Sequence, residues 1–207
     1  MRDHAQQAGN AGERRVARIL AKAGLPAVHD LTITLAGRTH QLDHVVAGRD
    51  RLFVLETKTW RGRIAGAAGA ERWTVQRPGQ RPVRAYNPLL QNATHAQALA
   101  ELAGVRVTPL VVSAGHAQAP DELTQHMVAV SKLAVRLGPP GQTGPAIAAA
   151  FERLATLKGD PRQARIAAKH RNRTSARFNP RLSHACWLVA AFALAITLAA
   201  AWQAAQG

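Results

Sequence analysis

Leu52-Phe53-Val54-Leu55-Glu56-Thr57-Lys58-Thr59-Trp60 joins an apolar run to two opposite charges. A short apolar run is typical of a strand that is buried on both faces. Side chains alternate along a strand, so Glu56 and Lys58 lie on one face together with Val54. Burial of either charge is costly unless the charge has a partner, a metal ion or a catalytic role. The pair therefore predicts a functional site at the end of a buried strand.

Two more strands are expected before this one, over residues 27–36 and 39–47. The turn Gly48-Arg49-Asp50-Arg51 would join the second strand to the third, so that the three form an antiparallel meander. Arg49 and Asp50, as the two central residues of that turn, would set the register of the hairpin.

That register would place Val45 opposite Val54 and Asp43 opposite Glu56. Two carboxylates so placed repel each other, and a divalent cation between them relieves the repulsion. A slip of one residue would instead send Asp43 to the other face of the sheet. The competing interpretation is a salt bridge on an exposed edge, between Lys58 and one of the two acids.

An N-terminal helix is expected to begin at Asn10, with Glu13 completing a capping box, and to end at Gly24. Val16 and Leu20 belong to its apolar arc, and Glu13 lies at the edge of that arc. Glu13 therefore has two interpretations, as a cap that complements the helix dipole or as a functional carboxylate.

A second helix is expected from Asn87-Pro88 to about Ala103, with asparagine as N-cap and proline as the first helical residue. Gln91 and His95 are one turn apart and share a face of this helix. Taken alone, they are typical of a polar pair on the surface.

The remaining pattern predicts short elements. Strands are expected at residues 73–76, 105–113 and 126–130, and helices at 131–137 and 144–157. Pro109 falls inside the second of these strands, which indicates an edge strand or an irregular start.

The chain of 207 residues has a net charge of +15, which predicts a polyanionic partner, either nucleic acid or an anionic membrane surface. Residues 158–184 hold eight lysines and arginines and one acid, so +7 lies there and +8 remains elsewhere. Cys186 is the single cysteine, which rules out an internal disulfide and is typical of a reducing compartment.

Residues 185–202 are apolar apart from Thr197, and as a helix they would span about 27 Å, close to the hydrocarbon thickness of a bilayer. Trp187 and Trp202 bracket the segment as interfacial residues do. The basic residues precede it, so we expect a single-pass protein of the inner (cytoplasmic) membrane with residues 1–184 in the cytoplasm. A buried alanine-rich helix is the alternative.

The chain resembles the nuclease-related domain (NERD) proteins, within the PD-(D/E)xK restriction-endonuclease-like nucleases. Four segments in order and spacing carry the resemblance, which covers about residues 9–103: Ala11-Gly12-Glu13-Arg14, Gln41-Leu42-Asp43-His44-Val45-Val46, Phe53 to Gly62, and Asn87-Pro88-Leu89-Leu90-Gln91-Asn92. Thr57 and Thr59 depart from the Val or Ile and the Asn that the family often has around the lysine.

The resemblance implies an α/β fold with a restriction-endonuclease-like core, a mixed β-sheet flanked by helices. It also implies a catalytic site of Glu13, Asp43, Glu56, Lys58 and Gln91. Asp43, Glu56 and the Thr57 carbonyl would hold Mg²⁺ or Mn²⁺. Lys58 would act on the attacking water, and Glu13 and Gln91 would position these groups.

These observations predict a NERD nuclease-like domain over residues 1–157, a polybasic linker over 158–184 and a transmembrane helix over 185–202. The expected function is that of a membrane-tethered, Mg²⁺-dependent phosphodiesterase that binds nucleic acid, DNA above all, through sequence-independent backbone contacts. Two alternatives stay open: an inactive nucleic-acid-binding module, and a scaffold on anionic lipid. The oligomeric state is also open.

Overall fold

In the computed structural model, residues 2–141 and 143–177 are described. The chain forms two compact units, residues 1–164 and residues 165–207. The first unit contains both β-sheets. In the second unit the described residues are helical and complete helix α6 (Pro161–Arg177).

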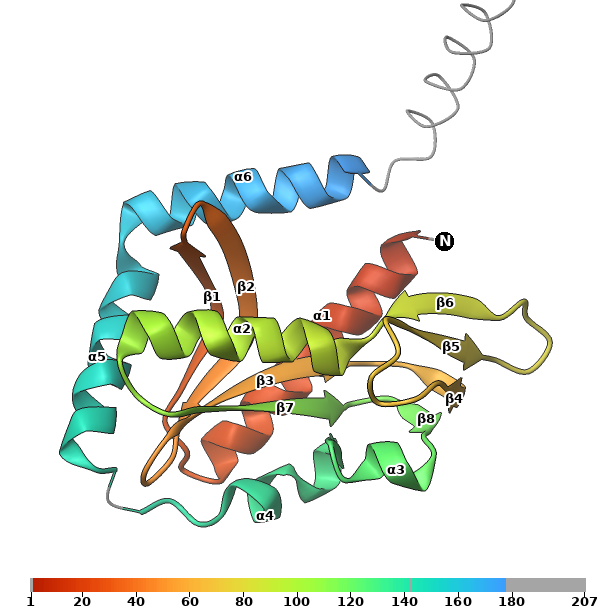
Figure 1. The fold of residues 1–207 in the computed structure, drawn as a ribbon, viewed down its shortest axis with the longest axis horizontal. Helices are drawn as coiled ribbons and strands as arrows, with labels where there is room; N and C mark the ends of the chain where they lie inside the picture. The colour runs from red at the N-terminus through yellow and green to blue at the C-terminus, as the bar shows by residue number, and fades with distance from the viewer. Residues whose placement is uncertain (1, 142, 178–207) are drawn as a thin grey trace, which may run out of the picture. The chain divides into compact units, whose positions relative to one another are not determined.

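A five-stranded sheet forms the centre of the first unit, in the strand order β1-β2-β3-β7-β9 (Figure 1). Its strands are β1 (Ala27–Leu35), β2 (Arg38–Ala47), β3 (Leu52–Lys58), β7 (Val107–Ser113) and β9 (Met127–Ala129). The first three strands are antiparallel, and β7 and β9 run parallel to β3 and to each other. The predicted meander and the predicted mixed α/β sheet are both confirmed.

The register of the β2–β3 hairpin is the one that the turn predicts. Val45 lies opposite Val54, and the Gly48 N–H donates to the Arg51 carbonyl at 2.9 Å. Arg49 and Asp50 are therefore the central residues of the turn. Since β3 lies between β2 and β7, it is an interior strand, and a salt bridge on an exposed edge is excluded at this place.

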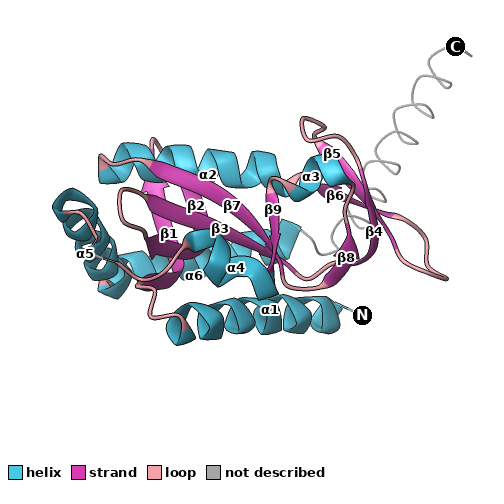
Figure 2. Ribbon diagram, turned by 90° about the horizontal axis from the view of Figure 1, so that it is seen from below, coloured by secondary structure: helices cyan, strands magenta, loops and turns pink. Residues whose placement is uncertain are grey.

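Helices cover both faces of this sheet (Figure 2). Helix α1 (Arg2–Lys22) packs on one face, where Val16 and Leu20 join Leu55 and Val112 in one apolar cluster. Helices α2 (Pro88–Ala103) and α5 (Pro145–Gly159) cover the other face. There Leu99 and Leu154 pack with residues such as Leu52 and Val54. Burial on both faces explains why β3 is apolar at nearly every position.

The expected start of the first helix is wrong. Helix α1 begins at Arg2, so Asn10 lies inside it and Glu13 is not part of a capping box. Alanine and glutamine precede Asn10 and favour helix, so the helix extends past the expected cap. Gly24 has a φ of 67° and ends the helix as predicted. The interpretation of Glu13 as a helix cap is therefore wrong.

Pro109 does not mark an edge strand, because β7 lies between β3 and β9. It pairs with Val54 of β3, whereas β9 pairs only with residues 111–113. Pro109 therefore lies before the part of β7 that pairs with β9. At its position β7 has a neighbour on the β3 side only, so the missing N–H costs no hydrogen bond to β9.

A four-stranded sheet follows β3, in the order β6-β5-β4-β8. Its strands are β4 (Arg61–Ala65), β5 (Arg72–Gln76), β6 (Val83–Tyr86) and β8 (His116–Gln118). Only β5 matches an expected strand. In both ribbon views this second sheet lies beyond the carboxyl ends of β3 and β7.

Short helices connect β8 to β9 and β9 to α5. They are α3 (Asp121–Thr124), the 3₁₀ turn Val130–Lys132 and α4 (Leu133–Leu137). Within residues 2–141 and 143–177, no helix has the length and apolar character that a membrane span needs. The predicted transmembrane segment, residues 185–202, lies outside the described residues and stays a prediction.

Candidate active site

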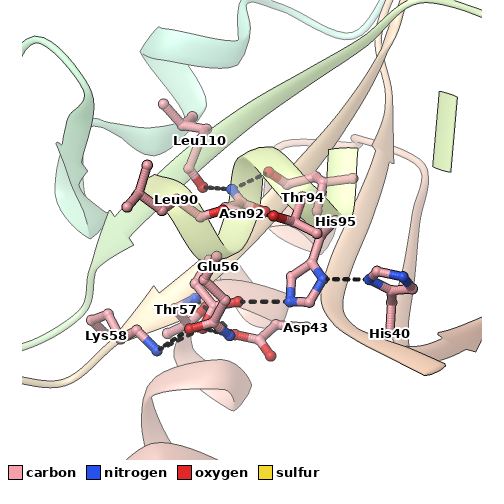
Figure 3. A network of polar contacts seen from close by, with 12 residues as sticks. His40, Asp43, Glu56, Thr57, Lys58, Leu90, Asn92, Thr94, His95 and Leu110 are labelled. Carbon is pink, nitrogen blue, oxygen red and sulfur yellow. Dashed lines mark hydrogen bonds and ion pairs between the residues drawn. The ribbon is translucent and has the colours of Figure 1, made fainter. Parts of the chain in front are cut away.

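Glu56, Lys58 and Gln91 form a closed set of contacts at the carboxyl end of β3 (Figure 3 shows the first two). The Lys58 ammonium donates to Glu56 Oε1 at 2.6 Å and to Gln91 Oε1 at 3.5 Å. The Gln91 amide donates to the same Glu56 oxygen at 3.0 Å. Glu56 is 4% exposed, so its charge depends on these donors in place of water. The shared face of Glu56 and Lys58 is confirmed.

Asp43 comes from β2 and joins this cluster through the main chain of β3. Its Oδ2 accepts a hydrogen bond from the Thr57 N–H at 2.7 Å. Burial and the charge of Glu56 raise the pKa of Asp43 to about 8, against the opposing effect of the Thr57 hydrogen bond. Asp43 and Glu56 thus come from adjacent strands, and the β2–β3 pairing extends to His44 and Leu55, so the direct pairing of Asp43 with Glu56 stays a prediction.

Glu13 approaches the cluster from α1. Burial, and then the charges of Asp30 and Glu56, raise its pKa above the ordinary value. A cavity of about 260 Å³ lies between α1 and the β1–β2 hairpin, and Glu13, Asp30, Asp43 and His44 are among its lining residues. The side chain of Glu13 therefore faces the same site as Asp43.

Gly12 explains how α1 comes so close to β3. A Cβ atom at Gly12 would overlap the methyl group of Thr59 and would lie 3.4 Å from that of Thr57. Only a residue without a side chain allows this approach, which places Glu13 next to the end of the strand.

Two histidines complete the cluster, and the sequence did not assign them to it (Figure 3). His95 Nε2 lies 4.0 Å from Glu56 Oε2, and its Nδ1 lies 3.3 Å from Nδ1 of His40. The spacing of Gln91 and His95 was a usable signal, because it places both on the face of α2 that turns toward β3. His40 had no such signal, since only the β1–β2 hairpin brings it to α2.

The asparagines of the Asn87–Asn92 segment have structural roles. Asn87 caps α2 as predicted, with its side chain accepting from the Leu89 N–H at 2.9 Å. The buried Asn92 amide donates to the carbonyls of Val54 and Leu110, at 3.0 and 3.1 Å. This bond pair fixes α2 to β3 and β7 and so positions Gln91 and His95.

The site offers hard oxygen donors from two carboxylates. In the described part of the chain, no three His, Cys, Asp or Glu side chains gather into a complete metal-binding group. Any ion here would combine Asp43 and Glu56 with main-chain or water oxygens, which is the kind of ligand set that Mg²⁺ accepts.

Comparisons with known proteins place the chain in a family. The nuclease-related domain (NERD) model matches residues 8–114. An uncharacterized protein of Bacillus anthracis is 35% identical over 112 residues, which cover 52% of this chain and 52% of that protein. The match thus spans about half the length of the relative. No solved structure matches the chain at a significant level. The matched segment contains Glu13, Asp43, Glu56, Lys58 and Gln91 and accounts for half of the sequence, and this chain belongs to the nuclease-related domain family.

Proposed function

We propose that this chain is a metal-dependent nuclease with a restriction-endonuclease-like core, and that it hydrolyses phosphodiester bonds of DNA. One observation carries the proposal: Asp43, Glu56 and Lys58 gather at the end of β3, and Gln91 contacts Glu56 and Lys58. Membership of the nuclease-related domain family supports the nuclease activity, because the family is described by its relation to nucleases.

Lys58 is the residue that we assign to the attacking water. Glu56 and Gln91 hold its ammonium from two sides. An ammonium so fixed can orient a water molecule and can offset the negative charge that develops on the phosphate. The Gln91 amide positions the lysine and can bond the water or a phosphate oxygen.

Mg²⁺ or Mn²⁺ is the cofactor of this proposal, with Asp43, Glu56 and the Thr57 carbonyl as its protein ligands. The residues fit such an ion, because burial and mutual repulsion of the carboxylates raise the pKa of Asp43, and a bound cation would offset both. When bound, the ion polarises a phosphoryl oxygen and lowers the pKa of a coordinated water. Glu13 would position Lys58 or bond a water of the ion from the α1 side.

The basic charge supports a nucleic-acid substrate. The net charge of +15 would supply affinity for the phosphate backbone without base readout. The predicted segment at 185–202 would tether the protein to the cytoplasmic face of the inner membrane, and residues 158–184 would meet anionic headgroups or DNA.

The test uses the full chain in a non-ionic detergent, with duplex DNA and Mg²⁺ or Mn²⁺. Cleavage should disappear in Asp43→Ala and persist in Asp50→Ala, which removes an exposed carboxylate from the β2–β3 turn of the same hairpin. Undiminished cleavage in a chelator would exclude the metal role. DNA binding without cleavage under every metal condition would support the inactive binding module instead.

A further inference from the structure

The second sheet has one buried face and one exposed face of opposite character. Ile64, Trp73 and Val75 are at most 2% exposed and point to the buried side, where Leu123 packs on Ile64 and Trp73. Because side chains alternate along each strand, the residues between them point to solvent. Those outward positions carry exposed arginines: Arg61 and Arg63 of β4, Arg72 of β5, and Arg84 of β6.

The register places these arginines on one continuous surface. Arg61 lies opposite His116, and Arg63 opposite Gln76. Between β5 and β6, Arg72 pairs with Tyr86 and Arg84 pairs with Thr74. Directly paired residues have their side chains on the same face, about 5 Å apart. We call the outward side chains of β4, β5, β6 and β8 the basic face.

The basic face is strongly unbalanced in charge. Residues 61–86 contain six arginines and one acid, Glu71. Glu71 lies just before β5 and is 4.0 Å from Arg72, with both side chains about half exposed or more. A single exposed contact of this kind neutralises little. Four cations on one rigid sheet therefore face solvent together.

The basic face lies next to the candidate active site along the chain. β4 begins three residues after Lys58, and the Ala114 N–H donates to the Lys58 carbonyl at 2.9 Å, just before β8 begins. β4 thus continues from the strand end that carries Glu56 and Lys58, and β8 follows the neighbouring strand β7 (Figure 1). Arg61 and His116 of the basic face line a hollow together with Gly12 and Arg15 of α1, and Gly12 is the neighbour of Glu13.

We infer that the basic face is the docking surface for the sugar–phosphate backbone of the DNA substrate, which rests on the proposed function. Guanidinium groups match the geometry of phosphate oxygens and form paired hydrogen bonds with them. The Tyr86 side chain, 45% exposed beside Arg72, offers a ring against which a sugar or an unpaired base can stack. The fixed spacing of the strands orders these cations without further loss of chain entropy.

The experiment compares two variants that lose the same charge. In the first, Arg63, Arg72 and Arg84 are replaced by glutamine. In the matched control, three exposed arginines elsewhere in the first unit are replaced in the same way: Arg38, Arg49 and Arg136. Binding of the full chain to a fluorescein-labelled DNA duplex is followed by anisotropy in a chelator, across a series of NaCl concentrations.

The basic-face variant should bind the duplex ~10-fold to 100-fold more weakly at about 100 mM NaCl, and the slope of log affinity against log salt should fall by about 2–3. The control should change affinity by less than about threefold. Equal losses in the two variants would overturn the inference. The single substitution Arg84→Gln, compared with Arg38→Gln, gives the same contrast with minimal disturbance of the fold.

Anionic lipid is the competing partner, and vesicles that contain phosphatidylserine test it. If the basic-face variant lost vesicle binding but kept its affinity for the duplex, the inference would be wrong. Retention of vesicle binding together with loss of DNA affinity supports it.

Two readouts separate this inference from the proposed function. The binding assay needs no turnover, so a wild-type chain that binds through the basic face but never cleaves would disprove the nuclease and leave the docking surface intact. With an active chain, the basic-face variant should raise the KM for DNA while its kcat on bis(p-nitrophenyl) phosphate, a small phosphodiester, stays unchanged. A lowered kcat on the small substrate would contradict the inference.

Discussion

The two sheets of the first unit handle charge in opposite ways. The five-stranded sheet is covered on both faces, and Glu56 and Lys58 at the carboxyl end of β3 are wholly or partly buried and bonded to each other and to Gln91. The four-stranded sheet is covered on one face only, and its charges are exposed, numerous and of one sign.

The environment decides what each set of charges can do. In a buried cluster, electrostatic interactions are strong and specific, and they shift pKa values and support chemistry. On an exposed face they are screened within about 10 Å at ordinary salt, so they supply affinity but little selectivity. We therefore assign chemistry to the five-stranded sheet and binding to the four-stranded sheet.

The largest effect is expected at Lys58. Replacement by methionine keeps the aliphatic stem but removes the ammonium that Glu56 and Gln91 hold, so cleavage of DNA should fall ~1000-fold or more. Lys132→Met, which removes an exposed lysine of the 3₁₀ turn, should cleave normally. Rates are measured under single-turnover conditions with saturating protein. A comparable loss of rate in both variants would mean that charge, and not position, matters.

Asp43 should limit the stability of the metal-free protein. Its pKa is raised to about 8 in the fold, so the folded state binds this proton more tightly than the unfolded state does. Stability then falls as the pH rises from about 4 through 8, and ionisation costs on the order of 5 kcal/mol near pH 8. Asp43→Asn keeps an acceptor for the Thr57 N–H and removes the charge, so in a chelator it should raise the free energy of unfolding by a similar amount.

The pH dependence gives this prediction a second readout. Burial, with a smaller contribution from His29, lowers the pKa of His44 to about 3, so between about pH 7 and 8 this imidazole is mostly neutral in both states. In that window the urea unfolding free energy of the metal-free chain should fall by about 1 kcal/mol per pH unit, and the Asp43→Asn slope should be flatter. Parallel slopes would show that Asp43 is already ionised in the fold.

His95 should have a smaller effect, as a positioning residue for Glu56. Its Nε2 faces Glu56 Oε2, and His40 bonds its other nitrogen, so it restrains the carboxylate from the α2 side. His95→Ala should lower kcat by roughly 10-fold with an unchanged KM for DNA, and His95→Gln should recover most of the rate. His126→Ala, at an exposed position, is the matched control. An identical defect in the alanine and glutamine variants would indicate packing alone.

Much of the first sheet was predictable because its signals are local. The turn at residues 48–51 and the apolar alternation fixed the β2–β3 register, and through it the approach of Asp43 to Glu56. Asn87-Pro88 fixed the start of α2, which brought Gln91 to the site. In each case, residues near in sequence determined the geometry that the site needs.

Most strands of the four-stranded sheet were not predicted, because they form through pairing between segments and not through a pattern within one segment. β4 contains Gly62 with a φ of 90°, and β6 follows a loop with prolines, so neither reads as a strand. Both become strands by pairing with β5, and Trp73 of β5 belongs to the apolar cluster on the buried side of this sheet. His40 was missed for the same reason, because it reaches His95 only after β1 and β2 have paired. Long-range pairing thus supplied what the pattern of single segments lacked.

The smallest effect should come from Trp73, and it tests whether the two sheets unfold together. Its indole Nε1 donates to the Ala67 carbonyl at 2.9 Å, and the second sheet has few other buried side chains. Trp73→Phe removes this bond at a cost of about 1 kcal/mol. In native-state hydrogen exchange, amides of β5 should then exchange about fivefold faster while those of β3 keep their protection. Faster exchange in both sheets would show a single cooperative unit, in which case the basic face could not be altered without disturbing the buried charges of β3.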